Sequence, residues 1–424
     1  MAKPKIRFKG YQDDWEQRKL GDFGKATGGT SIESEFSEDG IYKVISIGSY
    51  SENSVYNDQG IRAIKSDKTS NRILNRNDLT MILNDKTTSG NIIGRVLLIE
   101  ESGIYVYNQR TERIEINLDE YDPVFLYEML NAPNIREKII KQAQGNTQIY
   151  VNWTAISLLE YMIPSKEEQV KIGEYLHSIS NLITLHQRKC EETKKLKKFM
   201  LQKMFPQNGS LVPEIRFDGF TDDWEQRKLG EILISLQNNT LSRADLSNET
   251  GVAKNVHYGD VLIKFGEILD VSKEQLQMIL DESVLTKYKS SFLQNGDVIV
   301  ADTAEDSTVG KCSEIAGLND EVVLSGLHTI PYRPVKKFAT GYLGYYLNSN
   351  MYHNQLIPLM QGIKVTSISK SAMQDTNIVY PKLIEEQTMI GSYFKSLDHL
   401  ITLHQQKCDD LINLKKYMLQ NMFV

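Results

Sequence analysis

The chain has 424 residues, of which 40% are hydrophobic and 25% are charged, and its formal net charge is −6. This composition is ordinary for a folded globular protein, and the length predicts two to three domains. The acidic balance argues against a protein that coats DNA through bulk positive charge, so a role with nucleic acid requires local basic surfaces.

The sequence predicts neither a membrane protein nor a secreted one. It contains no run of about 18 apolar residues, as a transmembrane helix would require. The opening Met1–Lys5 leads into polar sequence without the apolar stretch of a secretory signal. Three cysteines, Cys190, Cys312 and Cys408, cannot build a disulfide framework. We therefore expect a cytoplasmic protein with no membrane association.

The opening segment of the chain is duplicated. Pro4–Gly21 (PKIRFKGYQDDWEQRKLG) recurs as Pro213–Gly230 (PEIRFDGFTDDWEQRKLG), and the run DDWEQRKLG is identical in both copies. A second matched pair begins at Glu167 and Glu385 and includes LITLHQ in both copies. The residues between these matches are far less similar. The repeat predicts two copies of one module, with a constant frame and divergent contents.

The first divergent block, residues 22–163, alternates short strand-like runs with polar turns, which is typical of a mixed α+β domain with curved sheets. A late apolar pattern predicts one helix in it. The expected strands are Tyr42–Gly48, Asn91–Glu100 and Thr111–Asn117, and the expected helix is Val124–Gln142.

The loops of this block are rich in side chains that hydrogen-bond with base edges and phosphates. One polar loop follows a strand ending near Leu83 and leads to Gly94-Arg95. Another, Gln144–Gln148, contains a glycine that would allow close backbone approach to a phosphate. The candidate DNA-binding residues are Asn84, Lys86, Thr87, Thr88, Ser89, Arg95, Asn108, Gln109, Arg110, Arg113, Asn146 and Gln148.

Residues 166–203 are predicted to form one long helix, which would span roughly 57 Å. Glu167 and Glu168 lie in its first turn, where the helix dipole favours anions. Small or apolar positions recur in steps of three and four, as in a heptad seam. The seam consists of Ile172, Leu176, Ile179, Ile183, His186, Cys190, Thr193 and Met200.

After a short linker at 206–213, the second block (residues 231–380) shares the pattern of the first but few identities. Expected strands are Gly259–Gly266 and Val322–Pro334, and the expected helix is Ala339–Ile357. A matched strand ends at Asp302 and is followed by a loop and Gly310-Lys311, and Gln361–Ser367 matches the earlier glycine loop. The candidate DNA-binding residues here are Thr303, Ser307, Thr308, Lys311, Ser325, His328, Arg333, Lys364 and Ser367.

The second helix repeats the seam of the first in the same phase, from Ile390 through Cys408 to Met418. Two such helices predict an antiparallel coiled coil, although two helices packed separately on their own domains would also explain the seams. We expect an α+β protein with two pseudo-symmetric domains joined by the long helices. The predicted segments are a first domain at 1–165, a helix at 166–205, a linker and second domain at 206–382, and a helix at 383–424.

At this point the chain resembles the specificity subunit of type I restriction–modification enzymes. The resemblance rests on the two DDWEQRKLG openings, the helix entries IPSKEEQVKIGEYL and YPKLIEEQTMIGSYF, and the divergent blocks between them. It extends from Ile6 to Phe423. No single motif is diagnostic, but the order of frame, block and helix, repeated once, is specific.

The resemblance implies two target recognition domains, each reading one half of a bipartite site in double-stranded DNA. The long helices would set the spacer and dock two adenine-methyltransferase subunits, which two restriction/translocase subunits would join. The subunit itself would be non-catalytic and hold no cofactor, with S-adenosylmethionine, ATP and Mg expected on the partners.

Patterns for catalysis on this chain are weak. Neither a GxxxxGK[ST] phosphate loop nor a GxGxxG fingerprint is present. The DPVF at Asp122–Phe125 is similar to a methyltransferase motif but lacks its second proline, and a helix start explains it better. Asp302, Glu305 and Asp306 near Lys311 loosely suggest a metal nuclease centre without a counterpart in the first block.

Three alternatives remain open from the sequence. His186, Cys190, His404 and Cys408 could converge on zinc in an antiparallel helix pair, although packing in the seam explains them better. The chain could be a coiled-coil scaffold that joins two protein-binding domains and binds no DNA. It could also be a stand-alone nuclease or methyltransferase, which the lack of a recognisable active site disfavours.

Overall fold

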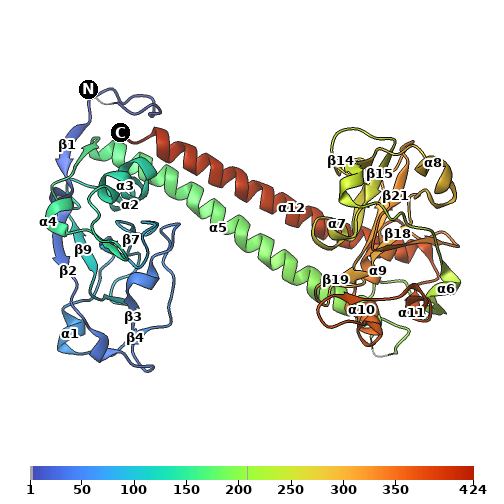
Figure 1. Ribbon diagram of the computed structural model, residues 1–424. Coiled ribbons are helices and arrows are strands. Elements are labelled where there is room, and N and C mark those ends of the chain that lie inside the picture. Colours follow the sequence, from blue (N-terminus) through green and yellow to red (C-terminus); the bar gives the residue numbers. More distant parts are fainter. Residues whose placement is uncertain (1–2, 208) are drawn as a thin grey trace. The chain divides into compact units, whose positions relative to one another are not determined.

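The computed structural model describes residues 3–207 and 209–424; Met1, Ala2 and the linker residue Asn208 lie outside the described residues. The chain divides into two compact units, residues 1–187 with 405–424 and residues 188–404. Each unit holds one α+β domain and one part of each long helix, α5 (Lys166–Lys203) and α12 (Ile384–Asn421) (Figure 1).

Besides the two-stranded pairs β1-β11 and β10-β6, the described part of the first unit has two larger sheets. One has the strand order β2-β9-β5-β7 and the other β4-β3-β8, in which β3 and β8 are parallel. The elements are β1 Glu16–Lys19, β2 Gly24–Gly28, β3 Tyr42–Ile45, β4 Arg62–Ala63, α1 Asp67–Ser70, β5 Leu79–Ile82, β6 Asn84–Asp85, β7 Val96–Leu98, β8 Tyr105–Tyr107, β9 Thr111–Ile116, α2 Pro123–Asn131, α3 Pro133–Ile140, β10 Ile149–Tyr150, α4 Trp153–Ile156 and β11 Glu160–Ile163.

The second unit repeats this topology with additions. Besides the pairs β12-β24 and β19-β23, its larger sheets have the orders β13-β22-β18-β20-β16 and β14-β17-β15-β21, with β15 and β21 parallel. The elements are β12 Glu225–Lys228, α6 Leu229–Ile232, β13 Leu233–Ser235, β14 Leu246–Ser247, β15 Ala253–Val256, α7 Tyr258–Ile263, β16 Ile268–Asp270, β17 Gln277–Ile279, α8 Val284–Lys287, β18 Val298–Ala301, β19 Thr303–Ala304, β20 Cys312–Ala316, β21 Val323–Ser325, β22 Thr329–Pro334, α9 Tyr342–Leu347, α10 Asn350–Leu356, β23 Thr366–Ser367, α11 Lys370–Gln374 and β24 Asn377–Tyr380.

The duplicated openings form the same structure twice. In each copy the EQRK segment is a strand that pairs antiparallel with the strand just before the long helix, β1 with β11 and β12 with β24. The arginine of each IRF segment binds a glutamate in the first turn of that helix, Arg7 with Glu168 and Arg216 with Glu386, both at 2.7 Å. These contacts hold the frame on the helix start, where the dipole also favours the carboxylate.

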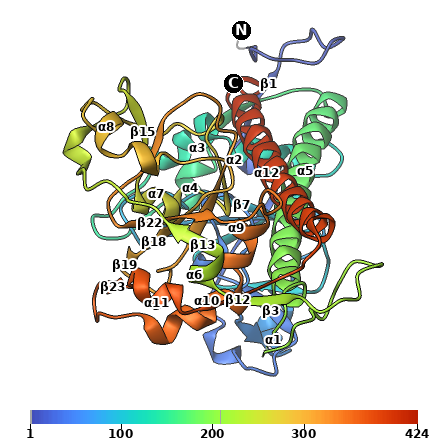
Figure 2. The same cartoon turned by 90° about the vertical axis from the view of Figure 1, so that its right-hand side faces the viewer.

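Within the first unit, the C-terminal part of α12 lies antiparallel beside the N-terminal part of α5 (Figures 1 and 2). Lys415 of α12 donates hydrogen bonds to Ser180 of α5 at 2.7 Å and to Glu128 of α2 at 2.9 Å. The predicted seam residues Ile172 and Leu176 are buried in the core of the domain. The lysine therefore joins the α+β domain to both helices.

In the second unit, Lys197 of α5 occupies the equivalent position. Its Nζ lies 2.6 Å from Asp398 of α12 and 2.8 Å from Glu267, which precedes β16. Although burial alone would lower it, the pKa of Lys197 is raised by these two carboxylates. The antiparallel packing of α5 and α12 and the two α+β domains agree with the predicted fold.

Several predicted elements differ from the structure. Gly259–Gly266, expected to be a strand, contains the helix α7, because the His257 ring accepts the Gly259 N–H and caps the helix start. The helix expected at Val124–Gln142 is divided into α2 and α3 at Pro133, which cannot supply the N–H that a continuous helix needs. In the part of the chain that the structure describes, no helix is long and apolar enough to cross a membrane.

Candidate nucleic-acid interface

Each recognition domain carries a short hairpin with the same backbone. In the first domain Gln144 and Tyr150 exchange two backbone hydrogen bonds at 2.9 Å, and in the second Gln361 and Ser367 do so at 2.9 and 2.8 Å. Both hairpins turn on a glycine with positive φ, 105° in Gly145 and 110° in Gly362. We call residues 145–149 and 362–366 the first and second tips.

The glycine at each tip cannot be replaced without moving the chain. A Cβ on Gly145 would lie 2.2 Å from the Gln148 carbonyl oxygen, and one on Gly362 would lie 2.0 Å from that of Val365. The positive φ adds to the strain that a side chain would meet there. The three residues that follow are exposed in both tips: Asn146, Thr147 and Gln148 in the first, and Ile363, Lys364 and Val365 in the second.

A two-stranded ribbon joins each hairpin to the polar loop that follows the matched sheet strand. In the first domain β6 pairs with β10, so Asn84 lies opposite Tyr150. In the second, β19 pairs with β23, so Thr303 lies opposite Ser367. The two loops that we singled out separately in each block are therefore parts of one surface.

A residue with left-handed backbone stands beside each ribbon. Arg110 has φ 68° and His328 has φ 55°, and each immediately precedes a central sheet strand. Their carbonyls accept equivalent hydrogen bonds, from the Leu83 N–H at 2.9 Å and the Asp302 N–H at 3.1 Å. Non-glycine residues rarely adopt this conformation, and it commonly marks functional sites. Both side chains are exposed.

Aspartates order the polar loops. Asp85 accepts hydrogen bonds from the backbone N–H and hydroxyl of Thr87 at 2.9 and 2.8 Å. Asp306 makes the same pair of contacts with Thr308, and these hydrogen bonds lower the pKa of Asp306. The remaining loop side chains are exposed: Lys86, Thr88 and Ser89 in the first domain and Ser307 in the second.

A hollow lies behind each ribbon. Residues at equivalent places line both, including Leu83 and Thr111 in the first and Asp302 and Thr329 in the second. The hollows differ in chemistry, because Glu112 lines the first where Ile330 lines the second. Burial raises the pKa of Glu112 to about 7.

Several predicted DNA-binding residues are instead held inside their domains. Arg113 and Arg333 form ion pairs with the buried Asp78 and Asp297 at 2.8 and 2.6 Å, which tie the ends of equivalent strands together. Burial lowers the pKa of Arg95 to about 10, and its guanidinium donates to the Asn91 carbonyl at 2.7 Å.

Other predicted residues are also engaged. Lys311 donates to the Leu262 carbonyl at 2.7 Å. Asn108 accepts the Ile32 N–H at 3.1 Å, and the buried Ser325 hydroxyl lies 2.6 Å from that of Thr329. Gln109 donates to Glu33 at 3.3 Å but stays exposed. The structure thus brings together a smaller set around each tip, exposed except for the half-buried Thr303: Lys86, Thr87, Thr88, Ser89, Arg110, Asn146 and Gln148, and Thr303, Ser307, Thr308, His328, Lys364 and Ser367.

The weak catalytic patterns have structural explanations. Asp122 of the DPVF segment accepts the Phe125 N–H at 2.7 Å and caps α2. Asp306 orders its own turn, and Lys311 points to a backbone carbonyl. Among residues 3–207 and 209–424, no three His, Cys, Asp or Glu side chains form a group that could hold a metal.

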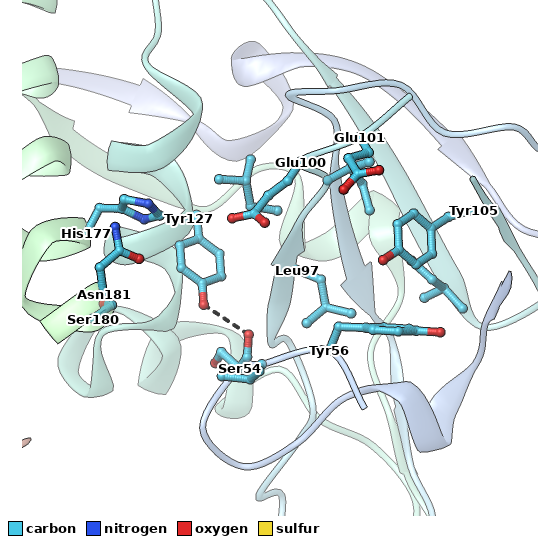
Figure 3. Close-up of a pocket in the computed structure, with 14 residues that line it drawn as sticks. Ser54, Tyr56, Leu97, Glu100, Glu101, Tyr105, Tyr127, His177, Ser180 and Asn181 are labelled. Carbon is cyan, nitrogen blue, oxygen red and sulfur yellow. Dashed lines mark hydrogen bonds between the residues drawn. The ribbon is translucent and has the colours of Figure 1, made fainter. Parts of the chain in front are cut away.

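A separate cavity of about 260 Å³ lies in the first unit, between α5 and the strand end Leu97–Glu101. Figure 3 shows Glu100, Glu101 and the Tyr105 hydroxyl around its centre, with His177 of α5 at one side. Tyr127 donates to the Ser54 carbonyl at 3.0 Å at its border. Two carboxylates make this cavity unsuited to phosphate, so we do not include it in the interface.

The residues expected from the sequence did not include Ile363 and Val365, which lie at the second tip, or Glu112, which lines the first hollow. The equal length of the two segments from glycine to proline aligns Ile363 with Asn146, and this alignment could have indicated them. No pattern in the sequence indicated that Arg110 and His328 are equivalent, because their conformation depends on strand pairing.

Together the fold and the two matched surfaces define a duplicated α+β protein. Its two candidate binding surfaces have equivalent backbones and different side chains. Residues 12–195 and 221–412 match the family described as the type I restriction modification DNA specificity domain. The chain belongs to this family. It is a DNA sequence-specificity subunit with two target recognition domains, itself non-catalytic, and the cofactors of these systems reside on the other subunits.

A curated relative carries a matching description, and two solved structures share the fold. The chain is 25% identical over 420 residues to the type I restriction enzyme MjaVIII specificity subunit of Methanocaldococcus jannaschii, covering 95% of this chain and 91% of the relative. A crystal structure of the S subunit of a type I system from M. genitalium superposes with a TM-score of 0.60 at 14% identity, covering 100% and 99% of the two chains. A structure from work on the assembly of the type I system gives 0.53 at 15% identity, covering 97% and 98%.

Proposed function

We propose that each recognition domain reads one half of a bipartite site in double-stranded DNA through its tip, polar loop and left-handed residue. One observation carries this proposal: the two surfaces share a backbone and differ in side chains, as two readers of different sequences require. A two-stranded ribbon fits the major groove, where base pairs are distinguishable.

The roles of the exposed residues follow from their chemistry. Lys86, Arg110 and Lys364 supply positive charge to phosphates, although the chain as a whole is acidic. Asn146 and Gln148 offer amides to base edges. Serine and threonine hydroxyls of the loops can serve either purpose.

The long helices would set the spacer between the half-sites. Each has 38 residues and is therefore about 57 Å long. Extending both helices by the same number of turns would lengthen the preferred spacer without changing either half-site.

We further propose that two methyltransferase subunits dock on the helices, one in each unit, and that two restriction/translocase subunits join them. The helices expose equivalent apolar side chains in the two units: Leu182, Leu414 and Tyr417 in the first, and Leu400, Leu196 and Phe199 in the second, each at least 37% exposed. Two surfaces with equivalent exposed apolar residues favour the binding of two copies of the same partner subunit. S-adenosylmethionine, ATP and Mg would be bound by those partners, in the cytoplasm.

A domain exchange tests the reading role. Residues 22–163 are replaced with the corresponding block of another family member, and methylated sites are mapped in cells that also express the methyltransferase. We expect one half-site to change and the other half-site to persist. Retention of the whole recognised sequence, or loss of both halves with the fold intact, contradicts the proposal.

A second experiment separates reading from the scaffold alternative and tests docking. The purified complex is used to select from random DNA, where a scaffold enriches no motif.

Native mass spectrometry then compares the Leu414→Ser/Tyr417→Ser chain with wild type, and we expect one of two methyltransferase subunits to be lost. Leu196→Ser/Phe199→Ser should cause an equivalent loss, and unchanged stoichiometry in both contradicts this docking site.

A further inference from the structure

The second tip exposes apolar side chains where the first exposes amides. Ile363 is fully exposed (102%) and Val365 is 54% exposed. They align with Asn146 and Gln148 of the first tip, since each tip begins at the equivalent glycine and closes with the same backbone pair. The contrast lies in side-chain chemistry, because the backbone is shared.

These side chains are presented by a held turn. The Gln361–Ser367 hydrogen bonds close the hairpin, and β23 pairs with β19. The polar loop next to it is fixed from behind, where the His353 ring lies 2.9 Å from the Ser307 carbonyl oxygen. A fully exposed isoleucine contributes almost no burial to folding, so its apolar surface is available to a ligand.

The proposed function places this tip against base edges, and this inference rests on that function. In the major groove the apolar group on a base is the C5 methyl of thymine. Lys364 stands between the two apolar residues and is exposed, so it can reach a phosphate beside the groove. The polar amide groups of asparagine and glutamine gain no binding energy from a methyl group. Isoleucine and valine can bury the methyl in an apolar contact.

We propose that Ile363 and Val365 recognise thymine methyl groups in the half-site read by the second domain. That half-site therefore contains at least one A·T pair whose thymine faces the tip. The first tip, with Asn146 and Gln148, reads its half-site through hydrogen bonds and is insensitive to the methyl. An apolar wedge between base steps is the competing mode of contact for such a tip, and it does not depend on the methyl.

The test uses the full chain with its methyltransferase and the site found by random-DNA selection. Single thymines in each half-site are replaced with deoxyuracil, which removes only the methyl. We expect about fourfold weaker binding for each contacted thymine in the second half-site, since burial of one such group is worth about 0.8 kcal/mol. Deoxyuracil in the first half-site should leave affinity unchanged.

The matched variant is Ile363→Ser/Val365→Ser, and because both side chains are exposed we expect its thermal stability to equal that of the wild type. This variant should bind thymine and deoxyuracil sites equally, both weakly. Asn146→Ser/Gln148→Ser is the control and should keep the full deoxyuracil effect in the second half-site.

Three outcomes overturn the inference: a second half-site without A·T pairs, no deoxyuracil effect, or an equal effect in both variants. Weaker binding of the isoleucine variant with no deoxyuracil effect identifies a wedge instead. If selection enriches no motif at all, the proposed function itself fails, which is a different result.

Discussion

The two tips follow the same path with different surfaces, 145–149 bearing amides and 362–366 bearing isoleucine and valine around a lysine. In both, a glycine with positive φ and two backbone hydrogen bonds fix the turn without using the side chains that follow. The geometry of both tips is therefore set by the backbone and the constant frame. The outward side chains are free to differ because the turn does not need them.

The lysine junctions make a second comparison. Lys415 in the first unit meets one carboxylate, Glu128, whose side chain is 2% exposed. Lys197 in the second meets Glu267 and Asp398, which are 20% and 35% exposed. The charge is in the same place, but its partners come from different elements and differ in access to water.

The largest expected effect comes from removing a junction lysine. Lys415→Met leaves the buried Glu128 without its cation, which should lower the free energy of unfolding by about 3–5 kcal/mol. Lys197→Met should cost less, because water reaches both of its partners. Thermal and denaturant unfolding of the full chain measures both. Lys416→Met is the matched control on an exposed neighbour, and a larger loss for Lys197→Met than for Lys415→Met contradicts the comparison.

The next effect depends on pH and distinguishes the two hollows. Because the folded pKa of Glu112 is raised from 4.5 to about 7, its contribution to stability is present below pH 4.5 and is lost as pH rises through 7. Glu112→Gln should therefore stabilise the chain at pH 8 by on the order of 1–3 kcal/mol and have little effect at pH 4.5. Melting curves at both values test this. Ile330→Gln, at the equivalent site, should destabilise at both, and a pH-independent effect of Glu112→Gln refutes the explanation.

A smaller effect separates the tips. Gly362→Ala places a methyl 2.0 Å from the Val365 carbonyl oxygen at φ 110°, so we expect about 1–2 kcal/mol of strain and weaker reading of the second half-site. Gly145→Ala should do the same to the first half-site. Binding to sites with one half scrambled measures each reader alone. If either substitution weakens both halves equally, the tips do not act independently.

The smallest effect is atomic. If Asn146 or Gln148 pairs with an adenine edge, 7-deazaadenine in the first half-site removes one acceptor and should weaken binding about fivefold to tenfold, or roughly 1 kcal/mol. The same base in the second half-site should have no effect through the second tip. Competition binding with modified duplexes measures the difference, and Asn146→Ala/Gln148→Ala should abolish it.

Much of the fold could be predicted because its signals are local or repeated. The duplicated openings and heptad seams located both frames, and the observed α5 (Lys166–Lys203) has the bounds that its pattern predicted. The strand prediction for Gly259–Gly266 was wrong, because a histidine cap beyond the apolar run decided the helix. The proline at position 133 could have indicated from the sequence alone that the helix expected at Val124–Gln142 is divided there.

The candidate surface was harder to predict, because exposure depends on tertiary contacts. Arg113 and Arg333 are suitable for DNA by residue type, yet strand pairing places Asp78 and Asp297 against them. Ile363 was overlooked for the opposite reason: an apolar residue is expected in a core, and only the closed hairpin shows it in solvent. Residue types therefore indicated which loops form the candidate DNA-binding surface. They did not indicate which side chains on it are exposed to a ligand.

The junction lysines imply a compatibility rule for chimeric specificity subunits. Each lysine belongs to the constant frame, whereas Glu128 and Glu267 belong to the divergent blocks, one on a helix and the other before a strand. Each block thus brings one carboxylate of its own to neutralise the frame. A foreign first block without a carboxylate at this place would leave Lys415 without a counter-charge. In the second position Asp398, supplied by α12, would rescue it, so the two positions should differ in the blocks they tolerate.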